Sequence, residues 1–123
     1  MPAWTPEILD SIQQEPDLYV SPFREDGTTY GTPTQTWALV VDGNVYVRAA
    51  NGTASRWYQA AISQNAGRIR VAGTVHDARF QDAPDAPADL IDAAYAAKYA
   101  GSSAVRIMQG PAPTSATVLI TPR

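Results

Sequence analysis

Residues 48–56 hold the side chains of this chain that best suit anion chemistry. Arg48 comes near the end of an apolar stretch, Asn51-Gly52 follows it, and Thr53, Ser55 and Arg56 come at the expected start of a helix. Free N–H groups at a helix N-terminus, hydroxyl groups and guanidinium groups are the donors that hold a phosphate in proteins. The segment therefore predicts a site for a phosphate or another anion.

Ordinary helix capping would use the same residues. Thr53 or Ser55 would accept a hydrogen bond from the first turn, and both arginines would lie on the solvated surface. Strand-to-helix turns of this kind are common, and the sequence has no P-loop and no GxGxxG pattern. On the residues alone, capping is the more common explanation and anion binding is the alternative.

Trp57 and Tyr58 are neighbours on the expected helix, so their side chains point about 100° apart and cannot share one face. We expect Trp57 to pack into the core. Tyr58 would then be free to line a pocket or a subunit interface. Tyr58 is the candidate catalytic residue of the chain, and we assign no partner acid or base to it.

Tyr95, Lys98 and Tyr99 share one face of another expected helix. A lysine beside two phenols would lower a tyrosine pKa or hold an anion, but burial of both rings with the lysine stem beside them is the more common arrangement. His76 is the only histidine, and cysteine is absent. We therefore expect His76 to be structural and predict no metal site.

The composition is that of one acidic domain. The chain has 123 residues, 45% of them hydrophobic, which suits a single domain over residues 1–123. The net charge of −3 argues against nucleic acid and against anionic membranes as partners. The anion site predicted above makes a small-molecule ligand the expected partner. We expect the acidic residues between positions 82 and 92 to place negative charge at a helix start and to favour solubility.

The expected location follows from apolar patterning. The longest apolar runs, residues 37–41 and 118–120, are far too short to cross a bilayer, and the first residues lack a basic and a hydrophobic signal region. The absence of cysteine excludes disulfides and thiolate chemistry. We therefore expect a cytoplasmic protein.

Local signals place helices and strands around these residues. Thr5-Pro6 predicts a helix start, because threonine caps well and proline suits the first helical position. We expect helices over residues 6–15, 53–64 and 87–100. We expect strands over residues 17–24, 34–41, 45–50, 68–80, 103–108 and 115–121, the fourth being one strand or two with a bend at Gly73.

Asp42-Gly43-Asn44 predicts a hairpin turn, since glycine and asparagine accept the positive φ that such turns need. On the return strand, side chains alternate, so Tyr46 and Arg48 face one side and Val47 faces the other. Hairpin-linked strands with few helices predict a mainly β, α+β fold. We expect an antiparallel barrel or sheet with helices at its ends.

Five segments form a pattern along the chain: YVSPFREDG at residues 19–27, DGNVYVRAANG at 42–52, SRWYQAA at 55–61, DAAYAAKY at 92–99 and TVLITPR at the end. In order and spacing they resemble a family of short bacterial proteins, domain of unknown function 2255 (DUF2255). That family is similar to the flavin-binding split-barrel superfamily, which includes pyridoxamine-phosphate oxidases and deazaflavin-dependent nitroreductases.

The resemblance implies a six-stranded antiparallel split β-barrel, and a homodimer that holds FMN or a deazaflavin in a groove at the subunit interface. It implies that the residues near the cofactor phosphate are Arg48, Ala50, Asn51, Gly52, Ser55 and Arg56. Trp37 and Tyr58 would touch the ring or the substrate. At Asn51 the chain departs from the deazaflavin branch, which often has lysine there, so Arg48 or Arg56 would have to supply the positive charge.

Three functions follow as expectations. The first is a flavin- or deazaflavin-binding oxidoreductase that acts on a small organic substrate, with Arg48, Ser55 and Arg56 on the phosphate. The second is a split barrel without cofactor that binds another small ligand, as a binding protein or a non-redox enzyme, and the neutral Asn51 favours it. The third is a purely structural or interaction module, which the composition neither supports nor excludes.

Overall fold

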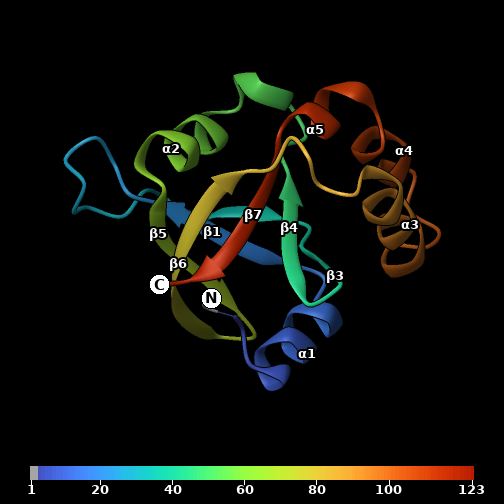
Figure 1. Ribbon diagram of the computed structural model, residues 1–123, viewed down its shortest axis with the longest axis horizontal. Helices are drawn as coiled ribbons and strands as arrows, with labels where there is room; N and C mark the ends of the chain where they lie inside the picture. The colour runs from blue at the N-terminus through green and yellow to red at the C-terminus, as the bar shows by residue number, and fades with distance from the viewer. Residues whose placement is uncertain (1–2) are drawn as a thin grey trace.

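Residues 3–123, which the computed structural model describes, form one curled antiparallel sheet with helices around it (Figure 1). The strands are β1 (Leu18–Pro22), β2 (Thr34–Thr36), β3 (Leu39–Val41), β4 (Asn44–Arg48), β5 (Ala66–Val71), β6 (Thr74–Asp82) and β7 (Thr117–Pro122). The helices are α1 (Pro6–Gln14), the 3-10 turn η1 (Gly52–Ala54), α2 (Arg56–Gln64), α3 (Ala88–Lys98), α4 (Ala104–Met108) and α5 (Pro111–Ser115). The predicted α+β class with antiparallel strands is confirmed.

The sheet curls into a half-barrel. Its order in residues 3–123 is β2-β1-β5-β6-β7-β4-β3, and each neighbouring pair is antiparallel. The two edge strands, β2 and β3, are consecutive in the chain and are joined only by Trp37 and Ala38. Three Cα–Cα steps span at most about 11 Å, so the two edges of the sheet must approach each other at this corner.

The prediction of one strand over residues 34–41 is wrong, because the structure breaks it between β2 and β3. Two side chains of α3 bind the carbonyl groups at the break. Tyr95 Oη donates to Trp37 O at 3.5 Å, and Lys98 Nζ donates to Ala38 O at 2.6 Å. These side-chain bonds satisfy carbonyls that a continuous strand would use in the ladder. With two strands also formed from the stretch 68–80 and none at residues 103–108, the described sheet has seven strands rather than the six predicted.

The prediction of a strand over residues 103–108 is also wrong, because this segment forms α4. Val105 and Ile107 are β-branched and favour a strand locally. Tertiary contacts favour the helix: the side chain of Met108 packs in the cluster on the outer face of β4, and its carbonyl accepts from Arg48 Nη1 at 3.0 Å. Positions four apart lie on one side of a helix, so Ala104 and Met108 face the same way.

The turns form at the predicted residues, and one helix begins later than predicted. Asp42 and Gly43 have φ of 53° and 79°, which confirms the hairpin turn. Ala72 and Gly73, with φ of 51° and 76°, divide the stretch 68–80 into β5 and β6. The helix expected from Thr53 begins at Arg56 instead, after η1 and an extended residue.

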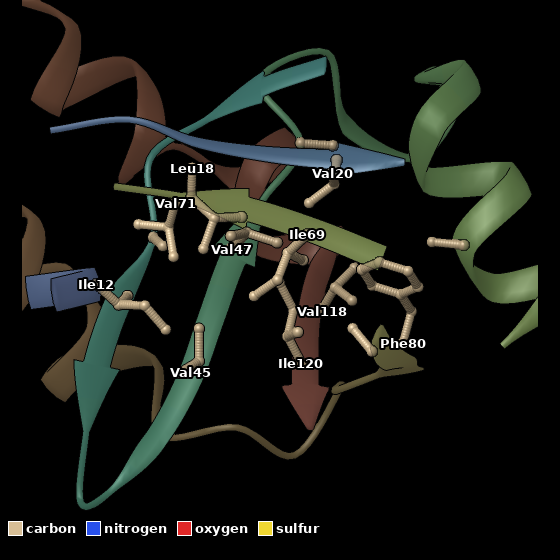
Figure 2. Close-up of a cluster of buried hydrophobic side chains, with 14 of the residues drawn as sticks. Ile12, Leu18, Val20, Val45, Val47, Ile69, Val71, Phe80, Val118 and Ile120 are labelled. Atoms are coloured by element: carbon tan, nitrogen blue, oxygen red, sulfur yellow. The ribbon is translucent and has the colours of Figure 1, made fainter. Parts of the chain in front are cut away.

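The inner face of the curled sheet encloses the main core. Figure 2 shows Val20, Val47, Ile69 and Phe80 pointing into this interior from four strands, and Ile12 of α1 reaching into it. The alternation predicted for β4 is confirmed, because Val47 belongs to this core while its neighbours on the strand face outward.

A second cluster covers the outer face of β3 and β4. Leu39 and Tyr46 on these strands pack against Ile91 and Tyr95 of α3 and against Met108 of α4. Arg48 lies on the same outer side as Tyr46, so α3 and α4 bury it rather than leave it in solvent.

Candidate functional site

A pocket of about 470 Å³ lies where β2, the end of β4, the start of α2 and α4 meet. Residues 34–37 form one side, residues 55–57 a second, and Ala104 with Met108 a third, and the remaining lining residues are Arg48, Ala50 and Asn51. The volume falls in the range of about 300–1,000 Å³ that small-molecule sites usually occupy. The pocket is therefore large enough for a small organic ligand.

The structure brings most of the predicted site residues into this one pocket. Those in its lining are Trp37, Arg48, Ala50, Asn51, Ser55 and Arg56. Gly52 and Tyr58 are outside the lining. Gly52 is buried behind it with φ of +68°, and a Cβ there would lie 3.2 Å from the Cβ and the carbonyl oxygen of Ala112 in α5, so it serves close packing.

Arg48 is buried beneath α3 and α4, with a side chain that is 0% exposed. Its Nε donates to Thr117 Oγ1 at 3.2 Å, and its Nη1 donates to Asp92 Oδ1 at 2.5 Å and to Met108 O at 3.0 Å. Arg48 is therefore not a solvated surface residue, and its guanidinium nitrogens are not all free to bind a phosphate. Arg48 joins β4 to β7, α3 and α4.

One nitrogen of Arg48 is left without a partner. Nη2 is buried and has no hydrogen-bond acceptor among residues 3–123. A buried donor in this state costs about 1–3 kcal/mol. Arg48 and its neighbour Met108 both belong to the pocket lining. Because the whole Arg48 side chain is 0% exposed, Nη2 does not reach the pocket surface, and Arg48 serves to hold the pocket wall in place.

The start of α2 brings a second set of donors to the pocket. Ser55 occupies the N-cap position, yet its side chain makes no capping hydrogen bond. The first N–H groups of a helix have no acceptor within it, and the helix dipole favours negative charge there. Arg56 is exposed at this point and lines the same pocket. These groups keep their capacity to bind an anion.

Two tryptophans provide flat apolar walls. Trp37 stacks on Tyr99, with ring centroids 3.9 Å apart and planes 6° from parallel, and Tyr99 Oη donates to Pro16 O at 2.7 Å. Trp57 is half-buried and lines the pocket. The expectation that Trp57 packs into the core is confirmed only in part, because Trp57 packs against the core while half-buried and Tyr58 is the buried member of the pair. Aromatic walls of this kind suit a planar ligand.

Tyr58 packs in the inner core, and its hydroxyl donates to Asp82 Oδ1 at 2.9 Å. Burial raises the pKa of Tyr58, and the Asp82 carboxylate raises it further. A proton held in this way, away from the lining, is not placed to reach a ligand in this pocket. The catalytic role of Tyr58 remains a prediction from sequence.

Tyr95, Lys98 and Tyr99 form a clamp on the β2–β3 corner. Lys98 Nζ donates to Ile12 O at 2.7 Å as well as to Ala38 O, and burial lowers the pKa of Lys98 to about 8. Burial raises the pKa of both tyrosines, so the lysine does not activate a phenol. The clamp positions the wall that Trp37 contributes.

Other predicted features lie outside the pocket. The ring of His76 meets the ring of Trp4 edge-on, with centroids 5.8 Å apart, as a structural histidine does. Within residues 3–123, no group of three or more His, Cys, Asp or Glu side chains is arranged to hold a metal ion, and the prediction of no metal stays a prediction. In that part of the chain, none of the helices combines the length and apolar character that a membrane crossing requires.

Two contributors were not predicted. Asp92 was grouped with acidic surface residues, although its position three residues before Tyr95 places it on the buried face of that helix. Met108 was assigned to a strand, which hid its place beside Arg48. Both contacts join segments far apart in the chain, so local patterns alone do not reveal them.

Comparison with protein families confirms the resemblance to the DUF2255 family. A family model described as "Uncharacterized protein conserved in bacteria (DUF2255)" matches residues 8–120, most of the chain. No curated protein matches the chain. The family description assigns no activity, so the pocket itself has to indicate the function.

Proposed function

Because the chain belongs to the DUF2255 family, we propose its function from the pocket: it binds FMN or a deazaflavin there and acts as an oxidoreductase on a small organic substrate. One observation carries the proposal. The exposed Arg56 lines the same pocket as an uncapped helix start and two tryptophans. A planar ring with an anionic group matches all three features together.

The residues present fit such a cofactor in chemical type. Trp37 and Trp57 offer flat surfaces for the ring, and Ser55, Arg56 and the first N–H groups of α2 are donors for the phosphate. Neutral Asn51 adds a hydrogen-bonding side chain and no charge, so Arg56 takes the part of the lysine found in the deazaflavin branch.

A bound flavin or deazaflavin supplies the redox chemistry, and the protein supplies position and electrostatics. The tryptophans would exclude water from the ring, while Arg48 would hold the surrounding elements in place through its bonds to Thr117, Asp92 and Met108. No lining residue is assigned the role of general acid. Proton transfer would then use the substrate or solvent.

The topology supports the finer assignment to a six-stranded split barrel. For this assignment β2 and β3, although separate strands, are counted as the two halves of one barrel strand interrupted at Trp37-Ala38. This strand then pairs with β1 through its first half and with β4 through its second half, so each of six strands has two neighbours. Closure of this kind leaves no free sheet edge.

We include a homodimer in the proposal, since the exposed Leu90 and Ile107 offer apolar surface to a second copy. A monomer in light scattering at every working concentration would contradict the dimer.

The cofactor proposal is tested by titrating the purified protein with FMN, with riboflavin and with a deazaflavin cofactor, followed by ligand fluorescence. FMN and riboflavin share one ring, so their difference reports the phosphate contact. We expect micromolar binding of FMN or the deazaflavin, and riboflavin about tenfold weaker than FMN. Arg56→Gln should remove most of this difference, and Arg106→Gln, at an exposed arginine of α4 outside the lining, should not. Binding of none of the three ligands at micromolar concentration would refute the proposal.

A ligand-binding protein without cofactor is the second candidate. The observation in its favour is electrostatic: Asn51 is neutral and the Asp92 carboxylate balances Arg48, so Arg56 is the lining residue whose charge stays uncompensated in residues 3–123. A protein of this kind would bind small aromatic compounds and show no preference for FMN over riboflavin. The same titration therefore separates the two candidates.

A further inference from the structure

We propose that Trp37 and Tyr99 form a stacking platform through which the pocket selects a planar ring, with Tyr99 as the positioning residue behind Trp37. The inference rests on the proposed function and specifies its ligand class. The ligand has a flat aromatic ring that lies on the indole of Trp37, and its anionic group points toward Arg56. Trp37 and Arg56 both line the pocket, whereas Tyr99 is outside the lining. Tyr99 therefore acts on the ligand through Trp37.

The indole of Trp37 has one face covered by the ring of Tyr99. The two ring centroids are 3.9 Å apart, and the ring planes are 6° from parallel. Tyr99 is buried, while Trp37 is half-buried and lines the pocket. The pocket therefore meets the part of the indole that Tyr99 does not cover. A ligand ring that lies there extends the stack from two aromatic rings to three.

The platform is held in place from α3 and from the residue that follows it. Tyr99 Oη donates to Pro16 O at 2.7 Å, which fixes the ring on which Trp37 stacks. Tyr95 Oη donates to the carbonyl group of Trp37 at 3.5 Å, and Lys98 Nζ donates to the carbonyl group of the next residue at 2.6 Å. Both the ring and the backbone of Trp37 are positioned before a ligand arrives. A preorganised surface of this kind loses less conformational entropy on binding.

Trp57, the other tryptophan of the lining, has no such support. It is half-buried and packs against the inner core. None of the close ring pairs within residues 3–123 includes Trp57, so no second ring holds it flat. We therefore assign the stacking surface to Trp37 and the role of an apolar side wall to Trp57.

Phenyl phosphate and cyclohexyl phosphate test this assignment, because they carry the same anionic group on a six-membered ring and only the first ring is flat and aromatic. Affinities are measured from signal shifts in nitrogen–proton correlation spectra. The phosphate contact is common to both probes, so the ratio of the two affinities reports stacking. We expect wild type to prefer phenyl phosphate about fivefold. Trp37→Leu should lose this preference, and Trp57→Leu should keep it within about twofold.

Two variants of Tyr99 test its positioning role. Tyr99→Leu removes the ring behind Trp37 and should bring the affinity ratio close to one. Tyr99→Phe keeps the ring, loses only the hydrogen bond to Pro16, and should keep at least half of the wild-type ratio. A loss of stability alone weakens both probes by the same factor and leaves the ratio unchanged. A wild-type ratio in Tyr99→Leu, or a preference lost in Trp57→Leu and kept in Trp37→Leu, would overturn the inference.

Wild type alone also tests the inference, so the result does not depend on whether Tyr99→Leu folds. The ring protons of bound phenyl phosphate should shift upfield and show proton–proton Overhauser contacts to the indole ring of Trp37. Contacts to Trp57 alone would overturn the inference. Binding of neither probe at millimolar concentration would overturn it as well.

The outcome can be told apart from that of the cofactor proposal. If wild type binds FMN and shows no preference for phenyl phosphate, the inference fails and the cofactor proposal stands. If wild type binds no flavin and prefers phenyl phosphate through Trp37, the inference stands and the cofactor proposal fails. Absence of both effects rejects both.

Discussion

Replacement of Arg48 by methionine should destabilise the protein by a limited and predictable amount. Methionine is long, flexible and apolar, so it fills much of the space of the arginine stem. The change removes the hydrogen bonds to Thr117, Asp92 and Met108 and leaves the Asp92 carboxylate without its partner. It also removes the unpartnered Nη2.

The expected magnitude follows from opposing terms. Breaking a buried ion pair by removing one partner costs about 3–5 kcal/mol. The remaining carboxylate of Asp92 is 36% exposed and regains water, which reduces the loss. Removal of a buried donor without an acceptor returns a further part of it, since such a donor costs about 1–3 kcal/mol. We expect a net loss of about 2 kcal/mol in the free energy of unfolding, or about 8 °C in Tm for a chain of this size.

Urea unfolding followed by tryptophan fluorescence measures this change, with Asp92→Asn and the double variant completing a mutant cycle. The two residues are in contact, so their effects should not add, and a coupling of about 1 kcal/mol or more is expected. Unchanged or increased stability in Arg48→Met would refute the view that Arg48 joins β4 to α3 and α4. A coupling near zero would refute the ion pair itself.

Three further predictions concern the clamp, the buried tyrosine and the sheet. In the folded chain the pKa of Lys98 is about 8, against a usual 10.5. Between these two pH values the unfolded chain binds more protons than the folded chain, so the free energy of unfolding should rise with pH. The rise is measured relative to the Lys98→Met variant, which lacks this titration. Urea unfolding from about pH 7 to 9.5 checks this, and a constant difference would contradict it. Tyr58→Phe removes the hydrogen bond to Asp82 and should lower the free energy of unfolding in urea by about 1 kcal/mol. FMN affinity should not change, and a tenfold loss of affinity would show that Tyr58 takes part in ligand binding. Gly67→Ala would place a Cβ 2.3 Å from a carbonyl oxygen of β1 and should cost about 3 kcal/mol or more. Gly43→Ala meets no atom within 4 Å and should cost about 1 kcal/mol for its positive φ, so equal losses in thermal unfolding would contradict the close approach of β1 and β5.

Local sequence patterns predicted the parts of the fold that depend on neighbouring residues. The hairpin at Asp42-Gly43 follows from turn chemistry, and the alternation along β4 follows from strand geometry. The strand, turn and helix that contain Arg48, Ser55 and Arg56 gave the candidate site, and these residues do share a pocket. Each of these inferences needs only a few consecutive residues.

Features that depend on distant partners were not predictable in this way. Periodicity shows that Trp57 and Tyr58 point apart, but only the position of the sheet decides which one is buried. Residues 104–108 have the composition of a strand and become a helix over β4. Arg48 was expected to be solvated or bound to phosphate, and its burial depends on a carboxylate 44 positions away.

The pocket can be tested most directly through the three tryptophans of the chain. Trp37 and Trp57 line it, while Trp4 lies elsewhere, with its Nε1 donating to Ile120 O at 2.9 Å. In nitrogen–proton correlation spectra, FMN should shift the indole signals of Trp37 and Trp57 and leave that of Trp4 in place. Shifts confined to Trp4, or no shift of any indole signal at millimolar FMN, would contradict a flavin site between β2, α2 and α4.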